Sequence, residues 1–345
     1  MTRVDQLIRK NIKDLIPYSS AREEYTGESA IFLDANENPY NSGTNRYPDP
    51  LQSALKLKIS QLKNVAADRI FLGNGSDEPI DLLIRAFCEP GSDNIISIKP
   101  SYGMYKVCAD INNVEFREVL LNQNFQIDKE GIVKVADRNS KLLFLCSPNN
   151  PTSNYLYRED IQYILEVFNG LVILDEAYID FSGEASLLNL LANYPNLVIL
   201  QTLSKAWGMA GLRLGMAFAS KEIIDILTRI KYPYNINILT QQFVYDRLNK
   251  MEEKENWVKM ILAQRNTLRK QLEKFSFVKN ILHSDANFLM VRFTDPKKVY
   301  QFLIGRKIIV RDRSRVPLCE GCLRITIGTP DENETLIKAL QEYPM

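Results

Sequence analysis

Histidine is almost absent from the sequence, since His283 is the only one among 345 residues. A single imidazole cannot build a metal site of several histidines, and it argues against a hydrolase with a Ser-His-Asp triad. Proton transfer in any catalytic site must then come from lysine, tyrosine, aspartate or glutamate.

Cysteines are few as well, and their number is odd. An odd count without an export signal favours reduced thiols. Cys319 and Cys322 have the spacing of half a zinc site, but no second ligand pair accompanies them, so we interpret both as turn and strand residues. We therefore predict that the protein binds no metal. The five cysteines are Cys88, Cys108, Cys146, Cys319 and Cys322.

Long apolar runs and an excess of one charge are also lacking. No run reaches the roughly 18 residues that a membrane-spanning helix requires, and residues 1–13 contain no signal-peptide core, which favours a cytoplasmic location. The net charge of +1 gives no general attraction to nucleic acids or anionic membranes. We expect neither as a partner, and any bound anion needs a local cluster of donors.

Short apolar runs alternate with helical patterns through the middle of the chain. This alternation predicts an α/β fold with a mostly parallel sheet that helices cover on both faces. Ligands of such sheets bind beyond the carboxyl ends of the strands, where most of the motifs below fall. The expected strands are residues 70–72, 94–98, 142–146, 171–175, 197–202 and 215–219, and the expected helices are residues 80–88, 102–111, 159–168 and 186–192.

The last part of the chain has the pattern of a separate α+β unit. A chain of 345 residues exceeds one typical core. We predict a large α/β domain from residues 47–250 and a small domain from residues 1–46 and 251–345. The small domain is expected to contain strands at 286–293 and 322–327 and helices at 296–304 and 332–342.

Two segments could bind a phosphate. Residues 72–78, Leu-Gly-Asn-Gly-Ser-Asp-Glu, lead from a strand into a helix, so the glycine backbone and free amides can approach an anion. The serine and aspartate of this segment are also good helix caps, and capping alone explains these residue types. The second segment, residues 202–215, surrounds Lys205 with two hydroxyls and Arg213, whose planar guanidinium can grip a phosphate or lie on the surface.

Other side chains could hold an aromatic ring beside the lysine. Asp175 ends an apolar strand, where a buried carboxylate needs a partner such as a protonated ring nitrogen. Tyr178 and Asn150 could donate to a ring oxygen, although Asn-Pro is also a turn signal. Tyr102 could stack on the ring or pack in the core. An amine, a carboxylate and a phosphate cradle are together the parts that a pyridoxal phosphate enzyme requires.

These motifs resemble those of the fold-type I aminotransferases over almost the whole chain. The lysine segment and the Asp-Glu-Ala-Tyr run at 175–178 are specific to the fold type. Residues 34–39, Asp-Ala-Asn-Glu-Asn-Pro, together with 311–312 and 323–329, narrow the likeness to the histidinol-phosphate branch. The remaining matching segments are 46–48, 73–78, 100–105, 147–152 and 202–215.

The resemblance implies a pyridoxal 5'-phosphate cofactor, joined to Lys205 as a Schiff base, with Asp175 on the ring nitrogen. It also implies a homodimer with shared active sites, in which Tyr47 of one subunit reaches the cofactor phosphate of the other. Lys205, Asp175 and Tyr178 would be the catalytic residues. The other implied cofactor contacts are Tyr178 and Asn150 at the ring oxygen, Tyr102 on the ring face, and Ser76, Asp77, Thr202, Ser204 and Arg213 at the phosphate.

The implied reaction is amino transfer from L-histidinol phosphate to 2-oxoglutarate, giving imidazole acetol phosphate and L-glutamate, a step of histidine biosynthesis. Arg311 and Arg324 would bind the substrate anion, with Tyr18 and Asn36 as further contacts. The alternatives are an aminotransferase for aromatic amino acids, a pyridoxal phosphate decarboxylase of amino-acid phosphates, and a non-catalytic regulator. The filled catalytic positions and the lack of a basic stripe argue against the regulator.

The sequence departs from the family pattern at Ser153. The family usually has Pro-Thr-Gly where this chain has Pro151-Thr152-Ser153. If the backbone at this position has a positive φ, a serine there is strained, whereas a glycine is not. We expect a small adjustment of the loop.

Overall fold

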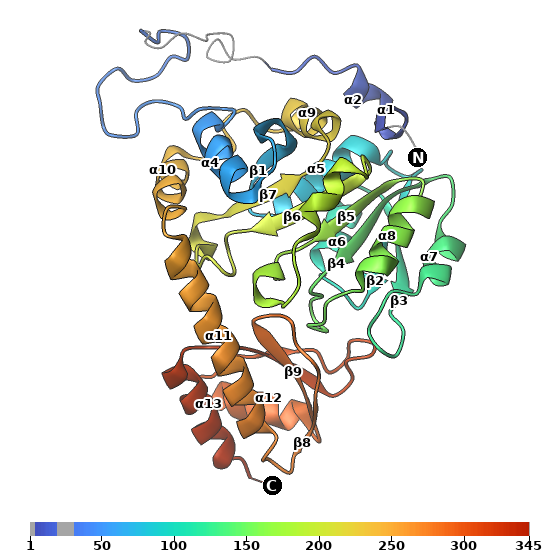
Figure 1. Cartoon of the computed structure of the whole chain (residues 1–345), viewed down its shortest axis with the longest axis vertical. Helices are drawn as coiled ribbons and strands as arrows, with labels where there is room; N and C mark the ends of the chain where they lie inside the picture. The colour runs from blue at the N-terminus through green and yellow to red at the C-terminus, as the bar shows by residue number, and fades with distance from the viewer. Residues whose placement is uncertain (1–3, 19–30, 345) are drawn as a thin grey trace.

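The computed structural model describes residues 4–18 and 31–344, and it folds them into two units that lie one above the other in Figure 1. The larger unit contains a seven-stranded sheet, and the smaller unit, which contains the C-terminus, has a four-stranded sheet. The long helix α11 (Met251–Leu272) runs from the larger unit into the smaller one. Within the described residues, no helix has both the length and the apolar character needed to cross a membrane.

The seven-stranded sheet confirms the predicted α/β architecture. Its strands are β1 (Ile70–Asn74), β2 (Asn94–Lys99), β3 (Glu115–Leu120), β4 (Ser140–Cys146), β5 (Leu171–Asp175), β6 (Leu197–Thr202) and β7 (Leu214–Phe218). Their order is β1-β7-β6-β5-β4-β2-β3, and all neighbours are parallel except the two pairs that include β7. Apolar runs predicted every strand but β3, which lies at the sheet edge and buries only Val119.

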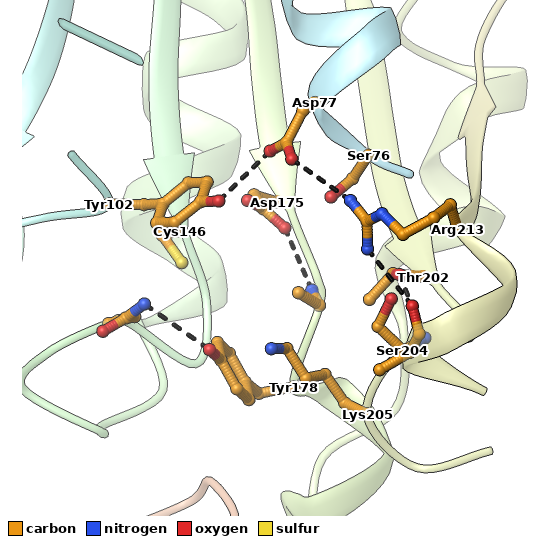
Figure 2. A pocket seen from close by; sticks show the side chains of 13 residues that line it. Ser76, Asp77, Tyr102, Cys146, Asp175, Tyr178, Thr202, Ser204, Lys205 and Arg213 are labelled. Atoms are coloured by element: carbon orange, nitrogen blue, oxygen red, sulfur yellow. Dashed lines mark hydrogen bonds and ion pairs between the residues drawn. The ribbon is translucent and has the colours of Figure 1, made fainter. Parts of the chain in front are cut away.

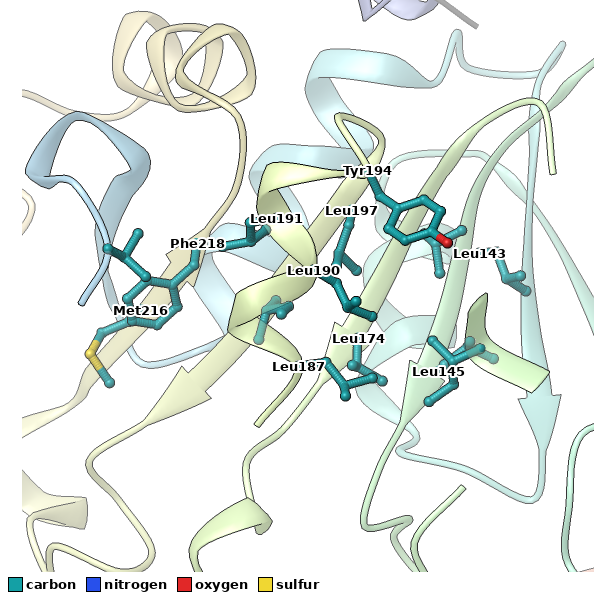
Figure 3. Close-up of a cluster of buried hydrophobic side chains, with 14 of the residues drawn as sticks. Leu143, Leu145, Leu174, Leu187, Leu190, Leu191, Tyr194, Leu197, Met216 and Phe218 are labelled. Atoms are coloured by element: carbon teal, nitrogen blue, oxygen red, sulfur yellow. The ribbon is translucent and has the colours of Figure 1, made fainter. Parts of the chain in front are cut away.

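Helices cover both faces of this sheet, as predicted. They are α4 (Ser53–Lys63), α5 (Asp77–Phe87), α6 (Met104–Ile111), α7 (Lys129–Val135), α8 (Arg158–Val167), α9 (Lys221–Ile230) and α10 (Ile238–Arg247), with 3-10 turns η1 (Ala67–Arg69), η2 (Ile179–Phe181), η3 (Leu187–Ala192) and η4 (Ala210–Leu212). Because successive strand side chains point to opposite faces, Ile173 of β5 packs with α5, α6 and α9, and Leu174 packs with α8 and η3. Figure 3 shows the apolar cluster that contains Leu174, in which Leu187 and Leu190 of η3 lie over the strands.

The helical stretch predicted at residues 186–192 is confirmed as a 3-10 helix, η3, which follows the cap Ser186. The turn has only six residues, starting after Ser186 and ending before Asn193. That length allows fewer than two α-helical turns, and short segments are where 3-10 geometry is common.

The smaller unit confirms the predicted α+β pattern. It consists of β8 (Val278–Ile281), β9 (Phe288–Phe293), α12 (Pro296–Gly305), β10 (Arg311–Asp312), β11 (Cys322–Thr326) and α13 (Pro330–Gln341). The strands form an antiparallel sheet in the order β10-β11-β9-β8. Leu289 and Leu323 of this sheet share one apolar cluster with Leu268 of α11, Val299 of α12 and Leu336 of α13.

The N-terminal helices α1 (Val4–Leu7) and α2 (Lys10–Lys13) lie on the larger unit, in contrast to the prediction that residues 1–46 join the smaller domain. Val4 and Leu7 are buried in the same apolar cluster as α5 and α9, and the Arg9 amide donates to the carbonyl oxygen of Ala86 at 3.0 Å. The burial of these apolar side chains is the physical reason for the difference. For residues 4–13 the predicted assignment does not hold, and the other domain boundaries stay a prediction.

Candidate active site

A pocket opens at the carboxyl ends of β4, β5 and β6, the edge of the sheet at which ligands were expected. Its cavity volume is about 140 Å³. We call it the lysine pocket. It is lined by Ser76, Asp77, Tyr102, Cys146, Asn150, Asp175, Ala177, Tyr178, Thr202, Ser204, Lys205, Ala210 and Arg213.

Asp175 is the buried carboxylate of the lysine pocket and the last residue of β5. Its Oδ2 accepts a hydrogen bond from the Tyr105 hydroxyl at 2.7 Å, and its Oδ1 accepts one from the Ala177 amide at 3.0 Å. Burial raises the pKa of Asp175, whereas these two hydrogen bonds favour its ionised form. The carboxylate is therefore held in one orientation and can pair with a cationic group in the pocket.

The amine of Lys205 points into the pocket beside Tyr178 (Figure 2). Its Nζ lies 5.5 Å from the centroid of the Tyr178 ring. Burial lowers the pKa of Lys205, and the positive charge of Arg324 lowers it further. A lysine with a lowered pKa has a larger neutral fraction near neutral pH, and the neutral amine is the form that acts as a nucleophile or base.

The turn between β1 and α5 forms one wall of the pocket, and two glycines let it lie close to β7. A Cβ added at Gly215 would come within 2.7 Å of the Gly75 carbonyl oxygen and closer still to the Ser76 amide nitrogen. No side chain caps the start of α5, so amides of its first turn are available to an anion. The residues Gly75, Ser76, Asp77, Thr202, Ser204 and Arg213 are referred to below as the anion cradle.

Hydrogen bonds connect the side chains of the anion cradle. The Arg213 guanidinium lies 3.5 Å from Oδ2 of Asp77, and Oδ1 of Asp77 accepts from the Tyr102 hydroxyl at 3.1 Å (Figure 2). The Ser204 amide donates to the Thr202 hydroxyl oxygen at 3.1 Å. A guanidinium, two hydroxyls and free amides thus face the same end of the pocket, a donor set that suits a phosphate.

Residues of the smaller unit reach the opposite side of the pocket. Nη1 of Arg324 donates to Oδ1 of Asn150 at 2.6 Å, and the Asn150 amide lies 3.4 Å from the Tyr178 hydroxyl. The Tyr178 ring packs edge-on against the Phe288 ring, with centroids 5.3 Å apart. Burial raises the pKa of the Tyr178 hydroxyl. Arg311 is exposed and pairs with Arg324 across β10 and β11. The two arginines therefore lie opposite each other on adjacent strands, and Arg324 contacts Asn150 of the pocket lining.

Ser153 has the positive φ that the sequence raised as a question, with a value of 68°. The side chain is buried, and its hydroxyl oxygen lies 2.8 Å from the carbonyl oxygen of His283 in the smaller unit. The loop that carries Asn150 is thereby bonded to the segment before β9. Serine keeps the left-handed backbone and adds a contact that a glycine could not make.

The structure brings all the predicted cofactor residues together except Tyr47. Tyr47 is half exposed and stacks on Tyr234 with ring centroids 4.4 Å apart, in a different pocket that Asn36 also lines. Tyr18 lies in a third pocket beside Arg9. A single chain therefore does not bring Tyr18, Asn36 or Tyr47 to Lys205.

Sequence reasoning missed four residues of this region: Cys146, Ala177, Ala210 and Tyr105. Cys146 could have been found, because it ends β4 directly beside Asp175 on β5. Tyr105 follows Tyr102 by three residues in a predicted helix, which indicates a shared face, but nothing in the sequence linked it to Asp175. The two alanines carry no signal.

The cysteines and the acidic residues give no sign of a metal centre. All five thiols are buried and unpaired, including Cys319 and Cys322. Within residues 4–18 and 31–344, no group of three or more His, Cys, Asp or Glu side chains is arranged to hold a metal ion.

Solved structures share this architecture. The histidinol-phosphate aminotransferase from Clostridium acetobutylicum superposes with a TM-score of 0.79 at 27% identity, over 87% of this chain and 90% of the other. The enzyme of that name from Sinorhizobium meliloti, solved in complex with pyridoxal-5'-phosphate, has a TM-score of 0.81 at 21% identity, over 87% of this chain and 83% of the other. The two units therefore have the fold of the fold-type I aminotransferases.

Sequence comparison defines the family. The model of the family described as aminotransferase class I and II matches residues 24–340. The histidinol-phosphate aminotransferase of Bacteroides fragilis is 55% identical over 344 residues, which are 99% of this chain and 100% of the relative. The chain belongs to the class I and II aminotransferase family.

Proposed function

We propose that the protein transfers the amino group of L-histidinol phosphate to 2-oxoglutarate and releases imidazole acetol phosphate and L-glutamate, a step of histidine biosynthesis. The observation that carries the proposal is the convergence of an amine, a buried carboxylate and the anion cradle in the lysine pocket. The name of the Bacteroides fragilis relative supports the choice of substrate, since the identity of 55% extends over essentially both chains.

Pyridoxal 5'-phosphate is the cofactor that the residues of the lysine pocket fit. When bound, it supplies a ring that withdraws electrons and stabilises a carbanion beside the transferred nitrogen. The uncapped start of α5 suits its phosphate, and the absence of a side chain at Gly215 lets β7 pack against the turn that carries these amides. Arg213, Thr202 and Ser204 would complete that contact, and Asp175 would hold the ring nitrogen.

Lys205 would hold the cofactor covalently and then act as the base of the reaction. Once the substrate amine has displaced it, its Nζ would take the proton from the substrate carbon and return it to the carbon on the other side of the nitrogen. Burial keeps part of the amine neutral, as this role requires. Asp175 would remain ionised and keep the ring nitrogen protonated during both proton transfers.

The remaining residues would position the ring and the substrate. Tyr178 and Asn150 would donate to the ring oxygen, and Tyr102 would stack on the ring face. Arg324 and Arg311 would bind the phosphate of histidinol phosphate or a carboxylate of 2-oxoglutarate, because a guanidinium can bind either anion with two hydrogen bonds.

We also infer a homodimer with shared sites. Ile31, Leu33 and Tyr40 of the N-terminal segment are more than four-fifths exposed, and a second copy would remove this apolar surface from water. The same contact would let Tyr47 reach the phosphate of the partner's cofactor, with Tyr18 and Asn36 as substrate contacts. The buried free thiols are in keeping with a reducing compartment, and we propose the cytoplasm.

A substrate panel tests the proposed reaction. Histidinol phosphate, phenylalanine, tyrosine and threonine phosphate are each incubated with the holoenzyme, with and without 2-oxoglutarate. We expect rapid glutamate formation from histidinol phosphate, only when 2-oxoglutarate is present. Fast phenylalanine turnover without histidinol phosphate turnover would identify the aromatic aminotransferase instead, and CO₂ release from threonine phosphate would identify the decarboxylase.

The variant Lys205→Ala is the matching control. It removes the amine but leaves Asp175 and the anion cradle in place. We expect it to lose turnover and the visible absorbance of the attached cofactor. Near-normal turnover in this variant would rule out the mechanism.

A further inference from the structure

Tyr105 lies behind the lysine pocket, on α6, and does not line it. Its side chain is completely buried, and its hydroxyl donates to Oδ2 of Asp175 at 2.7 Å. The Ala177 amide donates to the other carboxylate oxygen at 3.0 Å. One donor on each oxygen determines the orientation of the carboxylate, and of these donors only the tyrosine hydroxyl can be removed by substitution.

The proton of this hydrogen bond stays on the tyrosine. Burial raises the pKa of Tyr105 well above its ordinary value, and the charge of Asp175 adds to the effect. Burial also raises the pKa of Asp175, but the hydrogen bond from Tyr105 is the largest of the effects that lower it. The hydroxyl therefore favours the charged carboxylate at a position where burial alone would favour the neutral acid.

The Tyr105 ring is held rigidly by two aromatic neighbours. It stacks on Phe144 of β4 with centroids 4.7 Å apart and planes at 21°, and it meets Tyr102 edge-on at 5.5 Å and 85°. Tyr102 lines the pocket and donates to Asp77. Tyr105 thus contacts, from outside the pocket, two side chains that would hold the cofactor ring.

We propose that Tyr105 is a positioning residue that acts through Asp175, holding its carboxylate toward the ring nitrogen of the cofactor. This inference rests on the proposed function for the identity of the cofactor. Without the hydroxyl, Oδ2 of Asp175 loses its only side-chain donor among the described residues, and the carboxylate can turn away or take up a proton. The ring nitrogen would then keep its proton less firmly.

The variant Tyr105→Phe tests the proposal, because it removes the hydroxyl and keeps the ring. Its matched control is Tyr194→Phe, since Tyr194 is also buried and donates its hydroxyl to a carboxylate, that of Glu166, at 3.2 Å outside the lysine pocket. The measurements are the pH titration of the visible absorbance of the bound cofactor, the dissociation constant of the cofactor, and steady-state kinetics with histidinol phosphate.

We expect three changes in Tyr105→Phe. The midpoint of the absorbance titration should shift upward, because a ring that is less often protonated withdraws less charge from the attached nitrogen. Cofactor binding should weaken, and kcat should fall by about tenfold, the lower end of the loss for an outer-shell partner, while KM stays within about twofold. Tyr194→Phe should match the unchanged protein in all three. A Tyr105→Phe protein with the titration and kcat of the unchanged protein would overturn the proposal.

A double variant shows whether the effect passes through the carboxylate. If it does, Tyr105→Phe should add no further loss of kcat to Asp175→Asn, and fully additive losses would overturn the proposal. Should Tyr105→Phe alone fail to fold, the double variant should still fold, because no charged oxygen is left without its donor. Failure of both to fold would assign the hydroxyl a purely structural role and overturn the proposal as well.

These outcomes separate the inference from the proposed function. If the unchanged protein binds pyridoxal phosphate and converts histidinol phosphate while Tyr105→Phe behaves identically, only the role of Tyr105 is wrong. If the unchanged protein binds no pyridoxal phosphate, the proposed function fails first.

Discussion

The substitution Gly215→Ala probes how closely the anion cradle is built. Gly215 lies on β7 opposite Gly73 of β1, and a Cβ there would come 2.7 Å from the Gly75 carbonyl oxygen. Ordinary van der Waals contact begins at 3.4 Å, so the two groups must separate by 3.4 minus 2.7, or about 0.7 Å, at the least. The atoms that the Cβ meets belong to the backbone, so no change of rotamer relieves the clash.

The required shift falls on the turn whose amides we propose as phosphate contacts. β7 is hydrogen-bonded to β6 on one side and β1 on the other, whereas the turn at Gly75 and Ser76 is the nearest segment outside the strands. Overpacking of this kind typically costs about 1–3 kcal/mol of unfolding free energy. A displacement near 1 Å can cost on the order of 10²-fold in function, so we expect cofactor affinity to fall by about tenfold or more.

Gly211→Ala is the matched control, because Gly211 lies in η4, directly before β7, but a Cβ there would have no neighbour within 4 Å. The dissociation constant is measured by titrating apoprotein with pyridoxal phosphate and following its absorbance, and stability is measured by urea unfolding. Gly211→Ala should leave both values unchanged. If Gly215→Ala binds the cofactor as tightly as Gly211→Ala, the close approach of β7 does not shape the cradle and the reasoning is refuted.

Three further predictions concern Lys205 and Ser153. Burial and the charge of Arg324 lower the pKa of Lys205 below 10.5, so the rate of cofactor attachment to the apoprotein should rise with pH and level off below that value. Arg324→Gln should move the midpoint of this pH-rate profile upward, and an unmoved midpoint would contradict the prediction. Between the lowered pKa of Lys205 in the folded protein and its ordinary pKa, the unfolded chain binds more protons than the folded one. In that pH window the unfolding free energy of the apoprotein, measured relative to that of Lys205→Ala, should therefore rise with pH, and a fall would refute the lowered pKa. Ser153→Ala keeps the positive φ but loses the hydrogen bond to His283, so it should lower the unfolding free energy by about 1–2 kcal/mol. Ser153→Gly loses the same bond but relieves the backbone strain, so its loss should be smaller, and equal losses in urea unfolding would show that the positive φ carries no strain.

The sheet could be read from the sequence wherever its strands are buried on both faces. β5 and β6 consist of continuous buried residues, and a run of this kind identifies a central parallel strand without tertiary information. The edge strand β3 has no such run, since most of its side chains face water. The N-terminal helices were misplaced for a related reason: Val4 and Leu7 are apolar, but their order does not say which unit buries them.

The candidate site was predictable where residues end a strand or begin a helix. The carboxyl ends of parallel strands meet at one edge of the sheet, so Asp175 at the end of β5 and Thr202 at the end of β6 had to lie close together. Tyr47, Asn36 and Tyr18 have no such anchor. Their predicted positions at the active site depend on a second copy of the chain, so they stay predictions.

The sequence by itself determined the alternation of strands and helices and the set of polar groups gathered at the sheet edge, because both follow from local residue order. Tertiary structure decided which partners hold those groups in place. The hydrogen bond from Tyr105 to Asp175 joins residues 70 positions apart, and that from Ser153 to His283 joins residues 130 apart. Such bonds exist only after core packing has brought distant segments to within about 3 Å of each other, a distance that the order of residues does not record.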